Sequence, residues 1–363
     1  MISGPITTKF MQNFIRNRIP YGRRYPFFGS IETTRKCNSQ CAFCPIGNEK
    51  PEFKKGEMTI DQMLTVLNNF SDMNIIAVSF LGGEPTLKKN LYEVANYGKK
   101  KHIVSQVSTN GILLGDVVDD YTREFDVIVV SLDTLDPERY REIRGVDGYD
   151  KVINGIKESV KLSKKYNTTI FVNTVVCSKN IEEIPDVVKY SIDELGVKAI
   201  MIDFATYHDY WVNLTIKGSR YDPEGTDWRS KMDETKKLVK TLIQMKNKYP
   251  IITSRSYMNT FLTDDFRFQC HPYLFACVNK EGQVAMPCWD APVTKFYDIT
   301  QENNLRKIWF SKDVLELRKK VKDCSSCYMH CIVEPSKVLG NPLRNIPDLW
   351  EWIQVWKDAG TAL

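Results

Sequence analysis

Short apolar runs alternate with amphipathic stretches from residue 28 to about residue 204. The runs are rich in Val, Ile, Thr and Phe and nearly continuous in apolar character, which is typical of parallel strands covered on both faces. Between them, Thr59 begins one helical stretch as a cap, and Asp136 and Pro137 begin another with proline at the first helical position. Six strand–helix units in series predict an α/β fold, a partial (β/α)6 barrel of the TIM type. The expected strands are 28–33, 75–81, 103–109, 127–132, 169–176 and 199–204.

The rest of the chain divides into shorter segments around this expected barrel. A long charged helix follows the last strand, and a region with short elements and six cysteines follows the helix. In barrels of this kind the chemistry lies at the C-terminal ends of the strands. The expected segments are a basic amphipathic N-terminus (1–27), the barrel core (28–225), a linking helix and connector (226–261), a small cysteine-rich extension (262–335) and an aromatic C-terminal helix (336–363).

Composition and charge narrow the class of protein. The chain has 363 residues, 26% of them charged, which excludes wholesale disorder. A net charge of +5 is too small to predict nucleic-acid binding, so no nucleic-acid partner is expected. No run approaches the roughly 18 apolar residues of a membrane span. Because Lys9 and Arg16 interrupt the N-terminus, it does not read as a secretory signal, and a cytoplasmic location is expected.

Ten cysteines are the most informative part of the composition. Disulfide frameworks are typical of secreted chains under about 100 residues, and this chain is far longer. In a reducing compartment, clustered thiols more often bind metal. Cys177 stands alone, and the other nine form two groups: Cys37, Cys41 and Cys44, then Cys270, Cys277, Cys288, Cys324, Cys327 and Cys331.

The first group directly follows the first expected strand. Three residues separate Cys37 from Cys41, and two separate Cys41 from Cys44, so one loop can wrap around a single cluster. A [4Fe–4S] cluster usually has four cysteine ligands, and three would leave one iron open. The spacing alone also allows a zinc site or half of a ferredoxin-type cluster, although structural zinc requires a fourth ligand that is not found nearby.

The CxxxCxxC spacing, with Phe43 before the last cysteine, resembles the signature of the radical S-adenosylmethionine (SAM) superfamily. Further motifs of that family follow in the expected order, each at or near the end of an expected strand. Any one of them is weak, but the ordered combination is specific. They are Gly82-Gly83-Glu84-Pro85, Ser108-Thr109-Asn110-Gly111, Ser131-Leu132-Asp133 with Arg144-Gly145, and Asn173.

This resemblance implies that SAM binds the open iron of a [4Fe–4S] cluster. Electron transfer would release a 5′-deoxyadenosyl radical, which removes a hydrogen atom from an unactivated C–H bond. A ferredoxin or flavodoxin is the expected electron donor. By motif matching, Gly82, Gly83 and Glu84 would meet the SAM ammonium and Arg144 its carboxylate. Ser131, Asn173, Thr109 and Asn110 would contact its ribose or methionyl atoms, and Phe43 would lie beside its adenine.

The second cysteine group resembles the SPASM/twitch extension of some radical SAM enzymes, which binds auxiliary [4Fe–4S] clusters. Cys277 and Cys288 flank an expected hairpin with Gly282 at its turn. The twitch pattern favours Cys270, Cys288, Cys324 and Cys327 as ligands of one cluster. Cys277 and Cys331 are further candidate ligands, and a zinc knuckle is the alternative because zinc and iron–sulfur sites share thiolate spacing.

The N-terminus gives one indication of the substrate. Residues 1–31 contain no Asp or Glu, and Phe10, Met11, Phe14 and Ile15 are expected to share one helical face. Such a helix can lie on an anionic membrane, with the Trp-rich tail as a second anchor; the alternative is that both helices cap the barrel. Membrane contact would favour a lipid chain as the substrate. The basic residues are Lys9, Arg16, Arg18, Arg23 and Arg24.

Other substrates and other classes of protein stay open at this point. The rival substrates are a peptide, as in SPASM maturases, and a sugar or aminocyclitol. The stretch after the sixth strand predicts that Tyr207, His208 or Asp209 faces the substrate. As an enzyme, the chain is expected to be an oxidoreductase or transferase. The alternatives of another class are a non-catalytic iron–sulfur electron carrier and a zinc-dependent nucleic-acid-binding protein.

Overall fold

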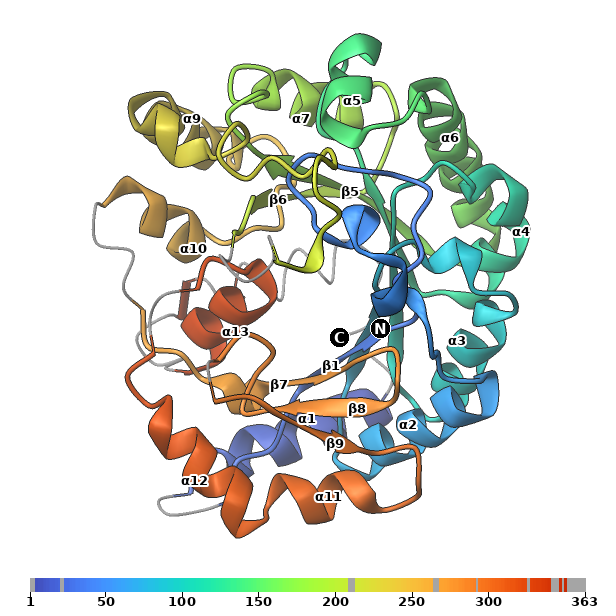
Figure 1. Cartoon of the computed structure of the whole chain (residues 1–363), viewed down its shortest axis with the longest axis vertical. Helices are drawn as coiled ribbons and strands as arrows, with labels where there is room; N and C mark the ends of the chain where they lie inside the picture. Colours follow the sequence, from blue (N-terminus) through green and yellow to red (C-terminus); the bar gives the residue numbers. More distant parts are fainter. Residues whose placement is uncertain are drawn as a thin grey trace.

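The computed structural model describes residues 4–19, 23–207, 213–263, 268–291, 293–324, 327–340, 346–347 and 349–350. One nine-stranded sheet, in the order β6-β5-β4-β3-β2-β1-β7-β8-β9, curves around the centre of the molecule (Figure 1). The six expected strands are confirmed, and neighbours among them pair in parallel. Their bounds are β1 Phe28–Glu32, β2 Ala77–Leu81, β3 Val104–Thr109, β4 Val127–Ser131, β5 Thr169–Val176 and β6 Ala199–Phe204.

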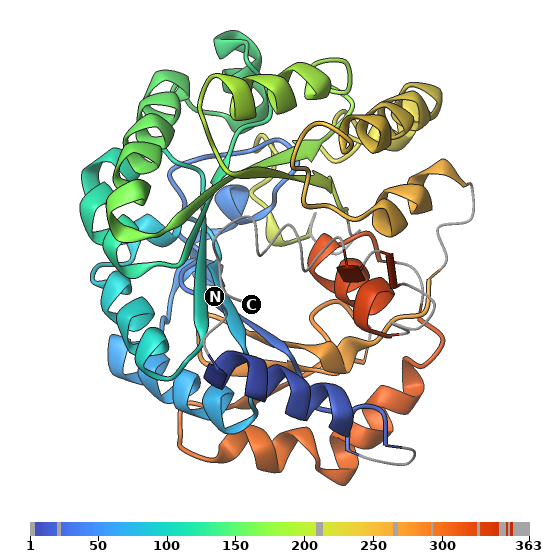
Figure 2. The same cartoon turned by 180° about the vertical axis from the view of Figure 1, so that it is seen from behind.

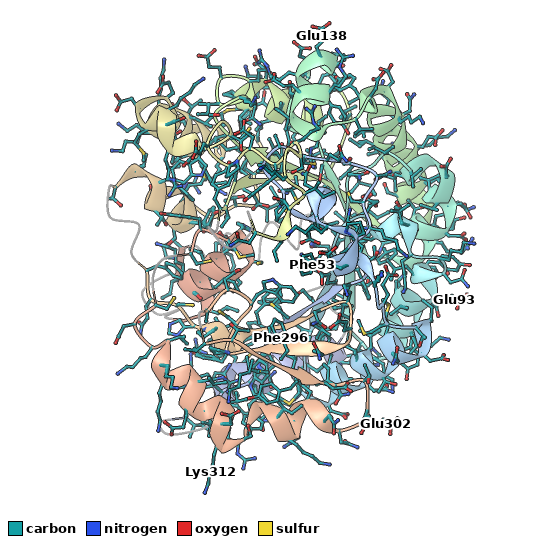
Figure 3. All side chains as sticks on the ribbon, in the orientation of Figure 1. Phe53, Glu93, Glu138, Phe296, Glu302 and Lys312 are labelled. Atoms are coloured by element: carbon teal, nitrogen blue, oxygen red, sulfur yellow. The ribbon has the colours of Figure 1, made fainter. Side chains whose placement is uncertain are left out.

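Helices cover the outer face of this sheet (Figure 1). The caps expected from the sequence form: Thr59 and Gln62 make a reciprocal capping box, and Asp136 accepts from the amides of Glu138 and Arg139. The charged side chains of Glu93, Glu138 and Lys312 lie on the outer rim and point away from the barrel (Figure 3). The outer helices are α2 Ile60–Asp72, α3 Leu91–Lys100, α4 Leu114–Glu124, α5 Pro137–Arg144, α6 Tyr149–Tyr166, α7 Ile184–Asp193, α9 Met232–Met245 and α10 Arg255–Asn259.

The cysteine-rich extension continues the barrel sheet. Its first strand, β7 (Phe275–Val278), pairs in parallel with β1, and β8 (Gln283–Met286) and β9 (Lys295–Asp298) follow as an antiparallel ribbon. Gly282 has φ +80° in the turn between β7 and β8, as the hairpin prediction requires. The helices α11 (Asn304–Trp309), α12 (Lys312–Lys320) and α13 (His330–Gly340) complete the extension.

Helix α1 (Gly4–Arg16) lies across the end of the barrel where the strands begin (Figure 2). Ile6 and Phe10 belong to a cluster that also contains Phe28, Val104 and Val127, the first residues of β1, β3 and β4. The helix therefore covers the end of the barrel, which is one of the two roles expected for it. No helix within the described residues combines the length and the apolar character of a membrane span.

The expectation that four apolar residues of α1 share one face is wrong. Phe10 and Phe14 pack against the barrel, whereas Met11 and Ile15 are exposed. Asn13 occupies the inner face instead, where its amide nitrogen donates to the carbonyl oxygens of Pro26, Met73 and Asn74. These hydrogen bonds tie α1 to two loops, and they fix which side of the helix is buried.

Candidate active site

The first three cysteines lie on the loop that follows β1. Asn48 holds this loop, because its buried amide nitrogen donates to the carbonyl oxygens of Cys41 (3.1 Å) and Cys44 (3.0 Å). The end of α5 holds it from the other side, since the amide of Gln40 donates to the carbonyl of Arg144. These hydrogen bonds hold the loop through its backbone and do not involve the three sulfur atoms.

The three thiols lie close enough to affect one another. Burial, and then the nearby Cys41 and Cys44, raise the pKa of Cys37 to about 12. Burial and Cys41 raise the pKa of Cys44 to about 11. Iron binds the thiolate, so metal binding must overcome these raised thiol pKa values.

Among the described residues, no three His, Cys, Asp or Glu side chains converge closely enough for a single metal ion. A four-iron cluster is larger than one ion, so its ligands stand further apart.

An arginine that the sequence analysis did not single out anchors the same loop. Arg35 forms ion pairs with Glu32 and Glu49, and both carboxylates are buried. These charges compensate one another where water is excluded, which makes the pairing necessary for the loop to fold. The residue types alone gave no signal for it, because Glu49 lies 14 positions away in the chain.

Gly82 and Gly83 bring the end of β2 against the cysteine loop. The amide of Gly83 donates to the carbonyl of Thr34, and the amide of Glu84 donates to that of Lys36. A β-carbon on Gly83 would lie 2.1 Å from the Lys36 carbonyl oxygen, and one on Gly82 would lie 2.3 Å from that of Thr34. Close approach of two backbones therefore explains both glycines, whatever else they contact.

Glu84 joins the ends of β2 and β3. Its carboxylate is fully buried and accepts from the hydroxyls of Thr86 (2.8 Å) and Thr109 (2.7 Å) and from the amide of Asn110 (2.7 Å). Burial raises its pKa, and these hydrogen bonds oppose the shift. Glu84 therefore has hydrogen-bond partners within this chain, in addition to the SAM ammonium group that the motif leads us to expect.

Asn110 extends the link from β3 to the cysteine loop. Its amide nitrogen donates to Asn38 (2.6 Å) and lies 3.9 Å from the sulfur of Cys37. Thr109 and Asn110 therefore lie beside the three thiols, as expected for residues of one site.

Arg144 reaches the same loop from the end of α5. Its Nε lies 2.5 Å from the buried Asp133 carboxylate, and its Nη1 lies 3.8 Å from the sulfur of Cys41. Its guanidinium carbon lies 5.3 Å from the ring centre of Phe43. The Nη2 atom is buried with no hydrogen-bond partner, so its N–H donors are left for an anionic ligand.

Ser131 and Asn173 are register partners at the ends of β4 and β5. The side-chain oxygen of Asn173 is buried and has no hydrogen-bond partner. At this end of the barrel, Asn173 Oδ1 is therefore a free hydrogen-bond acceptor and Arg144 Nη2 is a free donor. A ligand with hydroxyl and carboxylate groups, such as SAM, fits these two orphaned atoms, and the three thiols fit a cluster that it could share.

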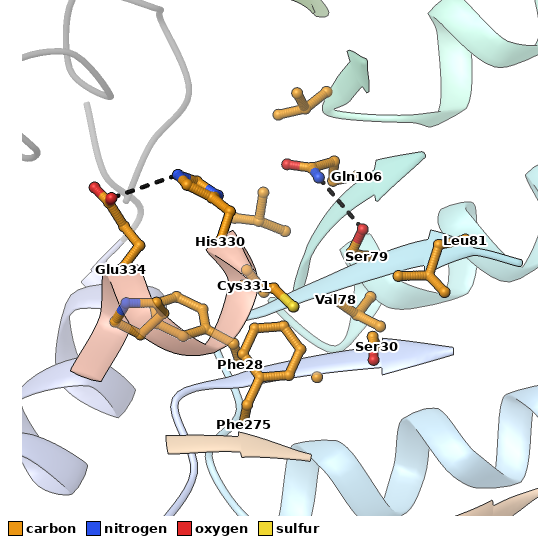
Figure 4. Close-up of a pocket in the computed structure, with 15 residues that line it drawn as sticks. Phe28, Ser30, Val78, Ser79, Leu81, Gln106, Phe275, His330, Cys331 and Glu334 are labelled. Atoms are coloured by element: carbon orange, nitrogen blue, oxygen red, sulfur yellow. Dashed lines mark hydrogen bonds and ion pairs between the residues drawn. The ribbon is translucent and has the colours of Figure 1, made fainter. Parts of the chain in front are cut away.

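A cavity of about 160 Å³ lies inside the barrel beneath this site (Figure 4). It extends from Phe28 and Val127, at the start of their strands, to Leu81, which directly precedes Gly82. Its wall is mostly apolar, and its described lining contains no lysine or arginine. Helix α13 closes one side with His330, Cys331 and Glu334.

The sequence analysis missed a buried acid–base cluster on this wall. The Nδ1 atom of His330 lies 3.6 Å from Asp203, and its Nε2 lies 3.4 Å from Glu334. Burial opposes the imidazolium charge, but the two carboxylates outweigh it and raise the pKa of His330 to about 9. Sequence spacing indicates only the pair on α13, because Asp203 comes from β6.

Four of the second group of cysteines are electrostatic neighbours. Burial, followed by the charges of Cys288, Cys324 and Cys327, raises the pKa of Cys270. Cys277 lies deeper, with its thiol hydrogen-bonded to Ser30, and Cys331 faces the cavity. The charge of Cys288 also acts on Cys277, and that of Cys327 on Cys331, so the preferred set of Cys270, Cys288, Cys324 and Cys327 stays a prediction. The roles of Cys277 and Cys331 as ligands stay a prediction.

The expected substrate residues are only partly described. The hydroxyl of Tyr207 donates to the carbonyl of Thr226 (2.7 Å), so it holds the loop that follows β6. His208 and Asp209 lie outside the described residues.

Comparison with known families gives two matches that together cover most of the chain. Residues 31–191 match the radical SAM superfamily. Residues 219–350 match a domain of unknown function, DUF3463, which forms a SPASM-like region.

Curated relatives match about half of the chain. The chain is 28% identical over 221 residues to a probable GTP 3′,8-cyclase of Methanocaldococcus jannaschii, covering 60% of this chain and 71% of that protein. It is 32% identical to one from Thermococcus kodakarensis (51% and 62%) and 30% identical to the GTP 3′,8-cyclase of Clostridium perfringens (48% and 54%). The chain thus spans little more than half the length of the last of these. None of these names supports a lipid substrate.

Solved structures share the fold at low sequence identity. Streptococcus suis SuiB bound to S-adenosylmethionine superposes with a TM-score of 0.62 at 17% identity, covering 81% of this chain and 68% of that one. The anSMEcpe structure with bound AdoMet gives 0.60 at 18% identity, covering 92% and 96%. At these identities the likeness establishes the fold alone.

Proposed function

We propose that this chain is a radical SAM enzyme that uses the loop of Cys37, Cys41 and Cys44 to activate an unreactive C–H bond in a substrate held inside the barrel. When bound, the [4Fe–4S] cluster and SAM supply a 5′-deoxyadenosyl radical. The observation that supports the proposal is the pair of orphaned buried atoms, Asn173 Oδ1 and Arg144 Nη2, at the strand ends that also hold the thiols.

The residues of this chain perform three tasks in the proposed reaction. The cysteine loop, held by Asn48 and Arg35, presents three sulfurs in one place. Arg144 and Asn173 orient the carboxylate and a hydroxyl of SAM through their free atoms. The apolar wall below Leu81 excludes water, which would otherwise quench a radical.

The test is reductive cleavage of SAM by the anaerobically reconstituted protein with dithionite. We expect 5′-deoxyadenosine in the wild type and none after Cys37→Ala. Cys177→Ala is the matched control, because Cys177 is buried and belongs to neither cysteine group. Equal cleavage by Cys37→Ala and the wild type would refute the proposal, and iron without SAM cleavage in the wild type would favour the electron carrier.

The auxiliary cluster is proposed to lie on Cys270, Cys288, Cys324 and Cys327. Its expected roles are electron transfer with the substrate or anchoring of the substrate, and a ferredoxin or flavodoxin is the expected donor. Whether the enzyme is an oxidoreductase or a transferase depends on the substrate, so both classes stay predictions.

The cavity favours a substrate with a large apolar part, such as a lipid chain. Most of its lining is aliphatic or aromatic, with a few polar groups at His330, Glu334 and Gln106. Its described lining has no lysine or arginine to bind a triphosphate, and the charge of His330 is already paired with Asp203 and Glu334. A substrate of this kind would be met at a bilayer, which predicts peripheral contact with a membrane.

GTP is the second candidate substrate, because the curated relatives are named GTP 3′,8-cyclases. The two candidates differ in what stimulates SAM cleavage: GTP in solution, or an isoprenoid or acyl lipid in detergent micelles. Ala77→Phe, which fills the cavity, should abolish lipid-stimulated cleavage and leave the unstimulated rate. Consumption of GTP by the wild type would reject the lipid proposal, and the peptide and sugar alternatives stay untested.

A further inference from the structure

An apolar stripe is exposed along the outer side of α1 and the turn after it. Met11, Ile15 and Ile19 recur every four residues and are 46%, 56% and 52% exposed. A second exposed apolar side chain, Trp350, follows Leu349, which packs against the same cluster as Ile6. Large apolar side chains therefore gather on the end of the barrel that α1 covers.

Within the described residues, the arginines of this region have no acidic partner. Arg16, Arg18, Arg23 and Arg24 stack on aromatic rings, with guanidinium carbons between 3.4 and 5.9 Å from the ring centres. None of them forms an ion pair with a carboxylate in the described part of the chain. Since residues 1–31 contain no Asp or Glu, the segment itself supplies no compensating charge.

A buried arginine of α12 joins this group. The Nη1 atom of Arg318 donates to the carbonyl of Trp309 (3.1 Å), and its guanidinium carbon lies 4.4 Å from the centre of the Trp309 ring. Its Nε and Nη2 atoms are buried without a hydrogen-bond partner. The indole nitrogen of Trp309 in turn donates to the carbonyl of Arg24 (2.8 Å), so one tryptophan holds both arginines.

The charges of three of these arginines act on the hydroxyl group of Tyr273. Burial raises the pKa of its hydroxyl, while Arg24, Arg18 and Arg318 each lower it, so all three arginines lie within electrostatic reach of that group. A buried cation without an anion is costly, and the orphaned donors of Arg318 add to that cost. Guanidinium forks match the geometry of phosphate oxygens, so a phosphate is the anion that fits.

We propose that this end of the barrel binds an anionic phospholipid bilayer, with lipid phosphate at Arg18 and Arg24, the buried charge of Arg318 adding to the attraction, and the stripe of Met11, Ile15 and Ile19 inserted among the acyl chains. Charge complementarity and the adjoining exposed apolar stripe favour a bilayer over a soluble phosphate. The inference rests on the peripheral membrane contact proposed above and names its surface. The apolar cavity begins at Phe28 and Val127, on the same side as α1.

The experiment is co-sedimentation of the full-length protein with vesicles of phosphatidylcholine alone or mixed with phosphatidylglycerol. We expect binding to the anionic vesicles, weakened by salt. The double variant Arg18→Gln/Arg24→Gln should lower the partition coefficient about 30-fold, since each cation near the surface contributes about 1 kcal/mol. Arg123→Gln is the matched control, because this exposed arginine lies on α4 and is paired with Asp119.

The apolar stripe is tested separately by Ile15→Asp, with Leu87→Asp as control, because Leu87 is similarly exposed (40%) but follows β2. Loss of binding only in Ile15→Asp supports the proposal. Equal binding to neutral and anionic vesicles, or an unchanged double variant, would overturn it. Binding of inorganic pyrophosphate without binding of vesicles would also overturn it, since the arginines would then serve a soluble ligand. SAM cleavage, measured on the same samples, reports failure of the proposed enzyme activity independently.

Discussion

Replacing Glu84 by glutamine separates a structural role of this carboxylate from direct contact with SAM. One oxygen, Oε1, accepts from the amide and hydroxyl of Thr86 and the hydroxyl of Thr109, and Oε2 accepts from the amide of Asn110. An amide group must place its NH2 at one of these positions. Hydroxyls can rotate to accept, but a backbone N–H cannot. Either orientation of the glutamine therefore leaves one backbone N–H facing another donor.

The expected loss of stability follows from that single conflict. A buried N–H without an acceptor costs about 1–3 kcal/mol, and hydrogen bonds to a charged group are worth more than those to an amide. The neutral side chain recovers part of this, because burial penalises the carboxylate and raises its pKa. We therefore expect Glu84→Gln to lower the free energy of unfolding by about 2 kcal/mol.

Urea unfolding, followed by circular dichroism under anaerobic conditions, measures this change. Glu93→Gln is the matched control, because Glu93 is exposed on α3 and should change stability by less than about 0.5 kcal/mol. SAM affinity should fall together with stability, because Asn110 links Glu84 to the loop of Cys37. Unchanged stability with strongly reduced SAM affinity would refute this reasoning and assign Glu84 to the ligand alone.

Three further predictions follow from the site and from α1. Asn173→Ser should weaken SAM binding about tenfold or more, measured by equilibrium dialysis, because Oδ1 is free for a ligand; unchanged affinity would contradict this. Cys288→Ser should remove about four irons on anaerobic iron analysis, whereas Cys331→Ser should retain them; equal loss would show that Cys331 is a ligand. Burial lowers the pKa of Lys9 to about 8, so the folded protein disfavours its charge. Stability of the wild type relative to Lys9→Met should therefore rise between about pH 8 and 10.5 and stay flat below pH 8; a decline over that range would be inconsistent with a buried Lys9.

Sequence periodicity determined the barrel because each strand carries its own apolar run and its own flanking caps. Thr59 and Asp136 could be assigned as caps from their neighbours alone, since capping hydrogen bonds span only two or three residues. The three cysteines of the first loop are likewise close in sequence, so their spacing predicts a shared cluster. The match of residues 31–191 to the radical SAM superfamily supports a [4Fe–4S] cluster in this part of the chain, and the assignment of its ligands stays a prediction.

The tertiary structure decided what the chain does with residues that are distant in sequence. Asp203 of β6 and His330 of α13 are far apart in the sequence and meet only in the fold, and Arg24 and Arg318 meet through Trp309, 285 positions from Arg24. Helical spacing placed Phe10, Met11, Phe14 and Ile15 together, but the hydrogen bonds of Asn13 to two loops rotated the helix and left Met11 and Ile15 outside. A local pattern specifies which residues are apolar, whereas the partners that bury them come from elsewhere in the fold.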